Sequence, residues 1–419
     1  MIPGPVTGVC PHCEAVGPVG ELCGQAVCQK RGYRHVPGEY AVETDRDPPD
    51  PLIGRQVADY LVVRLLGVGG FGKVYLALQR PILLKTALKI LDVTNLSEKM
   101  VGLVLERFEW EAAALALLQH PNVVRLIQYG SFEGAPYLVM EYIANGRTLA
   151  REMQERGAAG RGFEAEELRS LFRQLCLGLG AAHSVDIVHR DIKPDNIMLQ
   201  QAEGHPNLVR ILDFGLAKHI GGGGRTITTM GTPEFMAPEQ ITGENIGPWT
   251  DLYAVGVLSF ELLSGRRAYS GSSLTEIMSQ VCDPSYDPLS QVLRAALPEQ
   301  LLGVIRRAIS RDHRRRFQSA RELGAALDAS MERLEQVWSP PPLWEVARLG
   351  APPDQKLEAT HLQAAPGPRE EAPPVAPDDL SASRQDAFER WLKQEGQRLD
   401  QMQARLSSER ARRGGPSKD

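Results

Sequence analysis

The sequence lacks several features that would place it in a common class of protein. No run of apolar residues approaches the roughly 18 to 20 that a membrane-spanning helix requires. The first residues, from Met1 to Pro5, do not show the basic and then apolar layout of a signal peptide. An excess of positive charge is also absent, since 47 Lys and Arg stand against 52 Asp and Glu, for a net charge of -5. We therefore expect a soluble, cytoplasmic protein without a membrane span or a nucleic-acid partner.

Cysteine is scarce as well, which argues against a disulfide framework. The chain has 6 cysteines in 419 residues, and four of them cluster near the start: Cys10, Cys13, Cys23 and Cys28. Four thiolates suit tetrahedral Zn²⁺ in a closed structural site. The second pair is more widely spaced than the first, so two alternatives stay open. His12 or His35 could replace a cysteine, or the thiols could be free or redox-active.

Composition divides the chain into five parts. Ten prolines fall between Pro340 and Pro377 with few large apolar residues, which predicts an extended linker. The predicted parts are a Cys-rich, zinc-ribbon-like module at 1–40, a linker at 41–52, a folded domain at 53–335, the Pro-rich linker at 336–380 and an amphipathic helix at 381–414. For the last helix, self-association, docking on the folded domain, partner binding and the absence of any partner all stay open.

The folded domain changes character along its length. Before Met140, β-branched runs separated by glycines predict antiparallel strands. After it, apolar residues recur at spacings of three and four, as in helices with one buried face. Strands early and helices late predict an α+β fold with two lobes.

A glycine-rich segment occurs early in this domain, with Gly67, Gly69 and Gly72 at spacings of two and three. Glycines let a tight turn bring backbone N–H groups close to phosphate oxygens. In dinucleotide-binding folds such a string leads into a helix, whereas residues 74–78 predict a second strand here. On this segment alone, phosphate binding and an ordinary glycine-rich hairpin are both open.

Lys89 lies in the apolar strand 87–90, where an unpaired ammonium would be costly to bury. Glu111, on a helix predicted over 107–118, could supply one anionic partner, and nucleotide phosphates could supply the other. The alternative is a solvent-facing Lys and a surface Glu.

The next motifs arrive in a fixed order. Residues 189–196 read His-Arg-Asp-Ile-Lys-Pro-Asp-Asn, followed by Asp-Phe-Gly at 213–215 and Ala-Pro-Glu at 237–239. With the glycine loop, Lys89 and Glu111, this set closely resembles the protein kinase family over roughly residues 53 to 334.

The resemblance implies a two-lobed protein kinase fold, with an antiparallel β-sheet N-lobe and a mainly helical C-lobe, that uses ATP and Mg²⁺. It implies that Asp191 accepts the proton of the substrate hydroxyl and that Lys193 neutralises the migrating phosphoryl group. Asn196 and Asp213 would bind Mg²⁺, and Lys89 with Glu111 would hold the phosphates.

The resemblance also implies an adenine site. Met140 is similar to the family's gatekeeper residue, and the backbone of Glu141 and Ile143 would meet the adenine. The side chains expected above and below the ring are Val74, Ala87 and Met198, for which plain core packing is the alternative. The glycine-loop residues expected at the nucleotide are Leu66, Gly67, Val68, Gly69, Gly70, Phe71 and Gly72. Two expectations are architectural: Asp251 matches a structural Asp, and Glu239 pairs with Arg316.

Substrate class and regulation follow from the same resemblance. Lys193 and the segment 231–235 are similar to the Ser/Thr branch, so we expect Ser or Thr of protein substrates as acceptor. Arg190 beside Asp191 implies that a phosphate in the activation segment promotes activity. The candidate threonines, Thr228 first, are Thr226, Thr228 and Thr229; plain polar loop residues are the alternative. A small zinc ribbon before a kinase is similar to an arrangement in some bacterial Ser/Thr kinases.

Two rival functions stay open at this point. One is a pseudokinase, a nucleotide-binding scaffold that signals through lobe closure. The other is an assembly adaptor in which the Cys-rich module and the terminal helix carry the main role.

Overall fold

The structure is a computed structural model, which divides the chain into two compact units, Met1–Asp354 and Gln355–Asp419. It describes residues 7–41, 50–69, 72–92, 98–202, 205–214, 233–244, 246–291, 297–332 and 334, all in the first unit. The predicted Pro-rich linker, the predicted C-terminal helix and the three candidate threonines lie outside the described residues, so those expectations stay predictions.

The N-terminal module is a small antiparallel sheet with two short helices. The strands lie in the order β2-β1-β3. The bounds are β1 (Thr7–Val9), β2 (Val16–Pro18), α1 (Ala26–Lys30), β3 (Val36–Pro37) and α2 (Gly38–Ala41). Its own core is tiny and consists of Tyr33 and three buried cysteines. So small a core gives the module little stability of its own.

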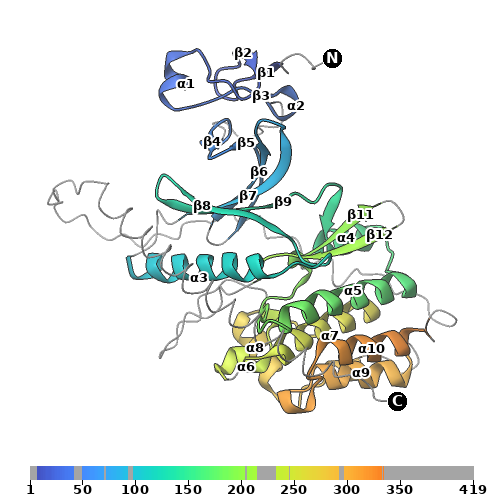
Figure 1. Ribbon diagram of the computed structural model, residues 1–419. Coiled ribbons are helices and arrows are strands. Elements are labelled where there is room, and N and C mark those ends of the chain that lie inside the picture. Colours follow the sequence, from blue (N-terminus) through green and yellow to red (C-terminus); the bar gives the residue numbers. More distant parts are fainter. Residues whose placement is uncertain are drawn as a thin grey trace, which may run out of the picture. The chain divides into compact units, whose positions relative to one another are not determined.

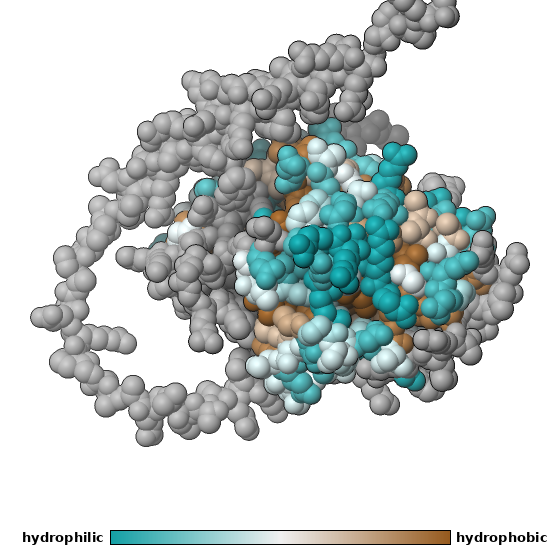
Figure 2. Space-filling model, turned by 90° about the horizontal axis from the view of Figure 1, so that it is seen from below, coloured by the Kyte–Doolittle hydropathy of each residue, from teal (hydrophilic) through white to brown (hydrophobic). Residues whose placement is uncertain are grey.

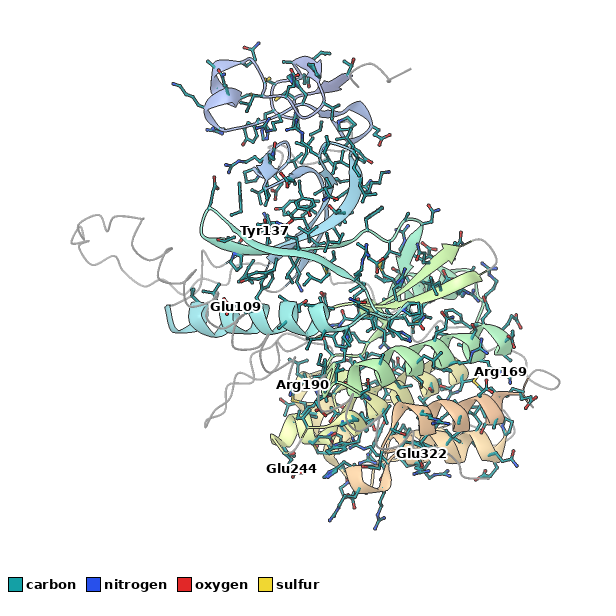
Figure 3. All side chains as sticks on the ribbon, viewed as in Figure 1. Glu109, Tyr137, Arg169, Arg190, Glu244 and Glu322 are labelled. Atoms are coloured by element: carbon teal, nitrogen blue, oxygen red, sulfur yellow. The ribbon has the colours of Figure 1, made fainter. Side chains whose placement is uncertain are left out.

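The N-lobe is a six-stranded antiparallel sheet in the order β4-β5-β6-β7-β9-β8 (Figure 1). The bounds are β4 (Gln56–Val57), β5 (Tyr60–Gly69), β6 (Gly72–Gln79), β7 (Leu84–Leu91), β8 (Leu126–Phe132) and β9 (Ala135–Glu141). Successive side chains alternate between the faces, so Tyr60 and Val62 belong to one buried cluster, and Leu61 and Val63 belong to another. Tyr137 of β9, labelled in Figure 3, lies in the first cluster.

Helix α3 (Glu98–Leu117) packs against the sheet and carries Glu111. It begins well before residue 107, where we predicted its start. The reason is that Val104, Phe108 and Ala112 recur every four residues and bury one continuous face against Leu138. Figure 3 labels Glu109 on this helix.

The C-lobe is mainly helical, with a small antiparallel sheet in the order β10-β11-β12. Its elements are β10 (Gly146–Thr148), α4 (Leu149–Ala158), α5 (Ala165–His183), η1 (Pro194–Asn196), β11 (Ile197–Ala202), β12 (His205–Ile211), η3 (Pro233–Phe235), α6 (Pro238–Thr242), α7 (Pro248–Ser264), α8 (Leu274–Cys282), η4 (Pro288–Gln291), α9 (Glu299–Ala308), η5 (His313–Arg315) and α10 (Ala320–Met331). Helix α7 is apolar nearly all round and is buried among the others. This core fixes the loops that precede β11 and follow β12.

The face seen in Figure 2 is mostly hydrophilic over its described part. Charged side chains of the C-lobe are exposed, among them Arg314 and Arg315, at 80% and 81%. Within the described ranges, none of the helices has the length and apolar character that crossing a membrane demands.

Candidate functional site

The glycine-rich hairpin joins β5 and β6, and its register pairs Gly69 with Gly72. Gly70 and Phe71 lie outside the described residues. Gly72 is so close to β7 that a Cβ atom there would lie 2.2 Å from the carbonyl oxygen of Ile90, so this position requires glycine. The apolar side chains of the hairpin at the expected nucleotide positions are half-buried or exposed, namely Leu66, Val68 and Val74.

The segment before the sheet contacts this hairpin close to its turn, where Lys73 directly follows Gly72. Lys73 Nζ lies 2.7 Å from Asp50 Oδ2, and the Tyr75 hydroxyl donates to Asp50 Oδ1 at 3.0 Å. The Asp50 side chain is only 6% exposed, whereas that of Lys73 is 33% exposed, so the carboxylate is the shielded partner. Residues 50–52, which we predicted to be linker, are therefore attached to the N-lobe. Our sequence reasoning missed Asp50 because a single acidic residue among prolines forms no pattern.

Lys89 of β7 is the centre of the first charged cluster. Its Nζ lies 2.8 Å from Glu111 Oε1 and 2.9 Å from Asp213 Oδ1. Burial alone would lower the pKa of Lys89, but the two carboxylates raise it above its ordinary value. Burial raises the pKa of Glu111, which the ammonium only partly opposes. The structure thus brings together three residues that lie far apart in the sequence, and it orients Lys89 by anionic partners on both sides.

A second charged cluster lies in the loop before β11. Lys193 Nζ lies 3.1 Å from Asp191 Oδ2. The Asn196 amide donates to the Asp191 carbonyl at 2.8 Å and to Asp191 Oδ2 at 3.1 Å. Pro194 starts the short η1 turn, which presents Asn196 toward Asp191. A cation and an amide therefore fix the direction of the Asp191 carboxylate.

The backbone of this loop is anchored on a buried carboxylate, that of Asp251 in α7. It accepts hydrogen bonds from the backbone N–H of His189 at 2.9 Å and of Arg190 at 2.7 Å. His183 Nε2 donates to it at 2.7 Å. Because the Asp251 side chain is fully buried, each of these donors replaces a lost water contact. Asp251 thus has the architectural place we expected, and His183 is a partner that the motifs did not reveal.

His189 connects the two charged clusters. Its Nε2–H donates to the Leu212 carbonyl at 2.7 Å, and its Nδ1 accepts the Asp191 N–H at 3.2 Å. Burial lowers the pKa of His189, which favours the neutral ring that this pattern requires. Its ring contacts Phe214, which is fully buried, at 4.7 Å between centroids. With Phe214 inside the core, the neighbouring Asp213 is directed toward Lys89.

Comparison with known proteins identifies this arrangement. The family described as "Protein kinase domain" matches residues 60–325, more than half of the chain. The chain belongs to the protein kinase family. Among solved structures, the kinase domain of PknI from Mycobacterium tuberculosis covers 67% of this chain and 98% of its own, at 25% identity and a TM-score of 0.53.

Two bacterial serine/threonine kinases are among the curated relatives of the kinase. The serine/threonine-protein kinase Pkn1 of Myxococcus xanthus is 35% identical over 292 residues, 67% of this chain and 40% of Pkn1. The serine/threonine-protein kinase PknL of Mycobacterium tuberculosis is 33% identical over 277 residues, 66% of each chain. This kinase therefore spans less than two thirds of the length of these relatives.

The link between the lobes of the kinase, residues 141–145, follows β9. Glu141 Oε1 accepts the Arg125 N–H at 2.9 Å and pairs with Arg210 at 3.3 Å, which ties the start of this link to β12. Met140 and Ile143 are buried. Ala87 pairs with Met140 in register across β7 and β9. The apolar residues expected around an adenine, Val74, Ala87 and Met198, are half-buried, as the walls of an accessible site would be.

The end of the activation segment is locked to the C-lobe of the kinase by a buried ion pair. Arg316 donates to both carboxylate oxygens of Glu239, at 2.8 and 2.9 Å. The adjacent Gln240 donates its Nε2–H to the Arg190 carbonyl at 2.8 Å, which links this anchor to the loop that carries Asp191. Figure 3 labels Arg190. The expected pairing of Glu239 with Arg316 is present.

The cysteine cluster lies in the module that precedes the kinase domain. The four Sγ atoms of Cys10, Cys13, Cys23 and Cys28 all lie within 4.8 Å of one another. In a tetrahedral zinc site with bonds of about 2.3 Å, neighbouring sulfurs are about 3.8 Å apart, so the four thiols fit such an ion. Burial raises the pKa of Cys28 to about 12, so a nearby cation is needed to hold it as a thiolate.

The two candidate histidine ligands have other partners. His12 Nε2 donates to the Ile53 carbonyl at 3.1 Å, and its ring stacks on Tyr33 at 3.5 Å. His35 Nδ1 donates to the Glu21 carbonyl at 3.1 Å. The geometry therefore favours the four cysteines.

Proposed function

We propose that this protein is a serine/threonine protein kinase that transfers the γ-phosphoryl group of ATP to Ser or Thr hydroxyls of protein substrates. Membership of the protein kinase family supports the reaction class. Relatives named as serine/threonine kinases, together with Lys193 in the catalytic loop, support the choice of acceptor. Since the chain spans only part of these relatives, its activity and substrates are inferred.

The N-lobe residues supply the nucleotide site in this proposal. The glycine hairpin lies over the phosphates, and Lys89, held by Glu111, pairs with them. The backbone of Glu141 and Ile143 meets the adenine beside Met140. The ion pair between Lys89 and Asp213 joins β7 to the start of the activation segment, so the phosphate-binding and metal-binding groups face each other.

The catalytic loop supplies the groups at the acceptor. Asp191 orients the substrate hydroxyl and accepts its proton, while Lys193 neutralises negative charge on the phosphoryl group in transit. Asn196 and Asp213 are the residues that would hold Mg²⁺, which when bound neutralises phosphate charge. Positioning and charge neutralisation thus carry the reaction, and no nucleophile of the enzyme is needed.

The observation that carries this proposal is the position of Asp191, whose carboxylate is held by Lys193 and Asn196 beside the Lys89 cluster. The test is transfer of labelled phosphate from ATP with Mg²⁺, measured for the purified protein and for Asp191→Asn. We expect labelled Ser or Thr that disappears in the variant. Binding of ATP by a protein that never transfers phosphate, with any substrate or activating kinase, would instead support the scaffold.

We extend the proposal to regulation. Arg190 Nε is buried and makes no hydrogen bond within the described part of the chain, which supports a role for Arg190 as the receptor of a phosphate on the activation segment. The acceptors we propose are Thr226, Thr228 and Thr229, with Thr228 first. Mass spectrometry of the autophosphorylated protein tests the assignment, and label confined to other residues would overturn it.

We also propose that the four clustered cysteines hold a structural Zn²⁺. The closed set of four thiols leaves no open coordination position, so the ion would hold the module together and take no part in phosphate transfer. Unpaired cysteines are typical of a reducing compartment, which supports a cytoplasmic location. Metal analysis of the purified protein and of a Cys23→Ser variant tests this assignment. For residues 381–414 we keep the prediction of an amphipathic helix that binds a partner or associates with a second copy.

A further inference from the structure

The N-terminal module and the kinase N-lobe share one hydrophobic cluster. Val36 and Tyr40 come from the module and are 0% and 7% exposed. They pack with residues on one face of the N-lobe sheet, namely Leu61, Val63, Leu76 and Leu78. Two hydrogen bonds strengthen the contact, since the Arg34 N–H donates to the Gly54 carbonyl at 2.7 Å and His12 donates to the Ile53 carbonyl at 3.1 Å. The module is therefore packed on the kinase domain rather than tethered to it.

This cluster reaches the adenine site of the proposed kinase. Tyr142 packs against it and lies between Glu141 and Ile143, whose backbone is expected to meet the adenine. Lys85 of β7, two residues before Ala87, has its Nζ 5.7 Å from the centre of the Tyr40 ring. The aromatic residue of the module thus contacts the sheet close to both the adenine-binding link and a wall of the nucleotide site.

The same module segment is held by the cysteine cluster. Cys10 directly follows β1, and Val9 of that strand pairs with Val36 of β3. The Cys28 carbonyl accepts the Tyr33 N–H at 3.0 Å, and the Cys23 N–H donates to the Tyr33 carbonyl at 2.9 Å. An ion bound by these cysteines would therefore fix both ends of the segment from Tyr33 to Val36, which leads into Tyr40.

We propose that Tyr40 is a positioning residue for nucleotide binding, through which metal occupancy of the cysteine cluster sets the affinity of the kinase for ATP. The inference rests on the proposed function at the nucleotide site and at the cysteines. With the module folded, Tyr40 and Val36 support the sheet face on which Tyr142 packs. Without the metal, this support loosens and the link between the lobes samples conformations that bind adenine poorly. The apparent Kd for ATP then rises in inverse proportion to the fraction of molecules that stay competent to bind.

The test is calorimetric titration of the full-length protein with ATP and Mg²⁺, before and after removal of the metal by a chelator. The proteins are the wild type, Tyr40→Ala, Tyr40→Phe and Val27→Ala. Val27 lies in the same module and is 69% exposed, so Val27→Ala is the matched control. Zinc content and the unfolding temperature are measured for each protein, so that loss of support by Tyr40 is separated from loss of the fold.

We expect Tyr40→Ala to retain its zinc and to raise the Kd for ATP about fivefold, as when only about a fifth of the molecules are competent. Tyr40→Phe keeps the ring and should bind as the wild type does, as should Val27→Ala. Chelation should weaken binding by the wild type to the same extent and should add little to the effect of Tyr40→Ala. If the effects of chelation and of Tyr40→Ala on the Kd for ATP do not add, both act through the same contact.

Two results would overturn the inference. One is a wild-type Kd for ATP in folded, zinc-loaded Tyr40→Ala, and the other is an equally large effect of chelation in Tyr40→Ala and in the wild type. If Tyr40→Ala does not fold, the ATP affinity of the wild type and of Tyr40→Phe is compared before and after chelation. An unchanged affinity after metal loss would contradict the inference that the metal acts on nucleotide binding. A wild-type protein that binds no ATP would instead refute the proposed function itself, and the inference with it.

Discussion

Loss of the buried ion pair between Glu239 and Arg316 should destabilise the protein far more than loss of a matched surface pair. The two side chains are 2% and 0% exposed, and Arg316 also donates to the backbone carbonyls of Ser310, Trp249 and Arg311. Removing Glu239 leaves the buried Arg316 charge with backbone carbonyls but without a counter-charge, and breaking a buried pair in this way costs about 3 to 5 kcal/mol. We therefore expect Glu239→Ala to lower the free energy of unfolding by about this amount.

The matched control has the same residue types on the surface of the C-lobe. Arg307 and Glu322 lie 2.6 Å apart, but their side chains are 45% and 42% exposed. Figure 3 labels Glu322. Glu322 also accepts the Gln318 N–H at 3.2 Å, in an exposed position. Water screens the ion pair and can replace this hydrogen bond, so Glu322→Ala should cost only about 0.2 to 1 kcal/mol.

Chemical and thermal unfolding of the two variants measures the difference. For a domain of this size a loss of about 4 kcal/mol lowers the Tm by on the order of 10 °C, whereas the surface variant should shift it by a few degrees at most. In a double-mutant cycle with Arg316→Met, the double variant should lose less than the sum of the two single losses, because the second charge has already lost its partner when it is removed. Equal effects of Glu239→Ala and Glu322→Ala would refute the reasoning that burial decides the strength of these pairs.

Three further results are expected. Lys89→Met should reduce phosphate transfer by at least about 100-fold, because it removes the charge that faces the phosphates. Gly72→Ala should cost about 1 to 3 kcal/mol of stability, since its Cβ would lie 2.2 Å from the Ile90 carbonyl oxygen. Burial raises the pKa of Glu261 to about 7 from its ordinary 4.5, so the folded chain binds this proton more tightly than the unfolded chain. The wild type should therefore lose up to about 3 kcal/mol of stability as the pH rises through that window, and Glu261→Gln should not.

Each of these results has its own check. Label transfer by Lys89→Met at the wild-type rate would contradict the role of that residue. Gly69→Ala is the control for Gly72→Ala, because its Cβ would meet its nearest neighbour only at 3.6 Å, and equal destabilisation by both changes would contradict the steric argument. Unfolding curves at pH 5 and pH 8 test Glu261. If the free energies of unfolding of the wild type and of Glu261→Gln differ by the same amount at both pH values, the pKa of Glu261 is not shifted.

The ordered motifs predicted the fold and the charged clusters. The motifs contain charged residues, and burying one such residue without a partner of opposite charge costs free energy. Lys89, Glu111 and Asp213 compensate one another only if the chain brings them together, so their order along the sequence carried three-dimensional information. The length of α3 was predicted poorly. Gly102 and β-branched residues near the beginning of α3 weaken its local helix signal, and packing against the sheet overrides it.

The contacts between the module and the kinase domain were not predictable from local pattern. Tyr40 and Val36 read as ordinary apolar residues of a small module, and their partners lie more than twenty residues further along the chain. Asp50 was assigned to a linker because of its neighbouring prolines. Such pairings depend on tertiary packing, and one sequence contains no periodic signal for them.

The shared cluster of the module and the N-lobe also bears on how the kinase can be shortened for laboratory work. A protein that begins at residue 53 would uncover four apolar side chains which the module now covers, namely Leu61, Val63, Leu76 and Leu78. It would also lose Asp50 and leave Lys73 without its buried partner. Contiguous exposed apolar surface promotes aggregation. We therefore expect low solubility from such a fragment, and a loss of its activity would say little about the chemistry of the catalytic loop.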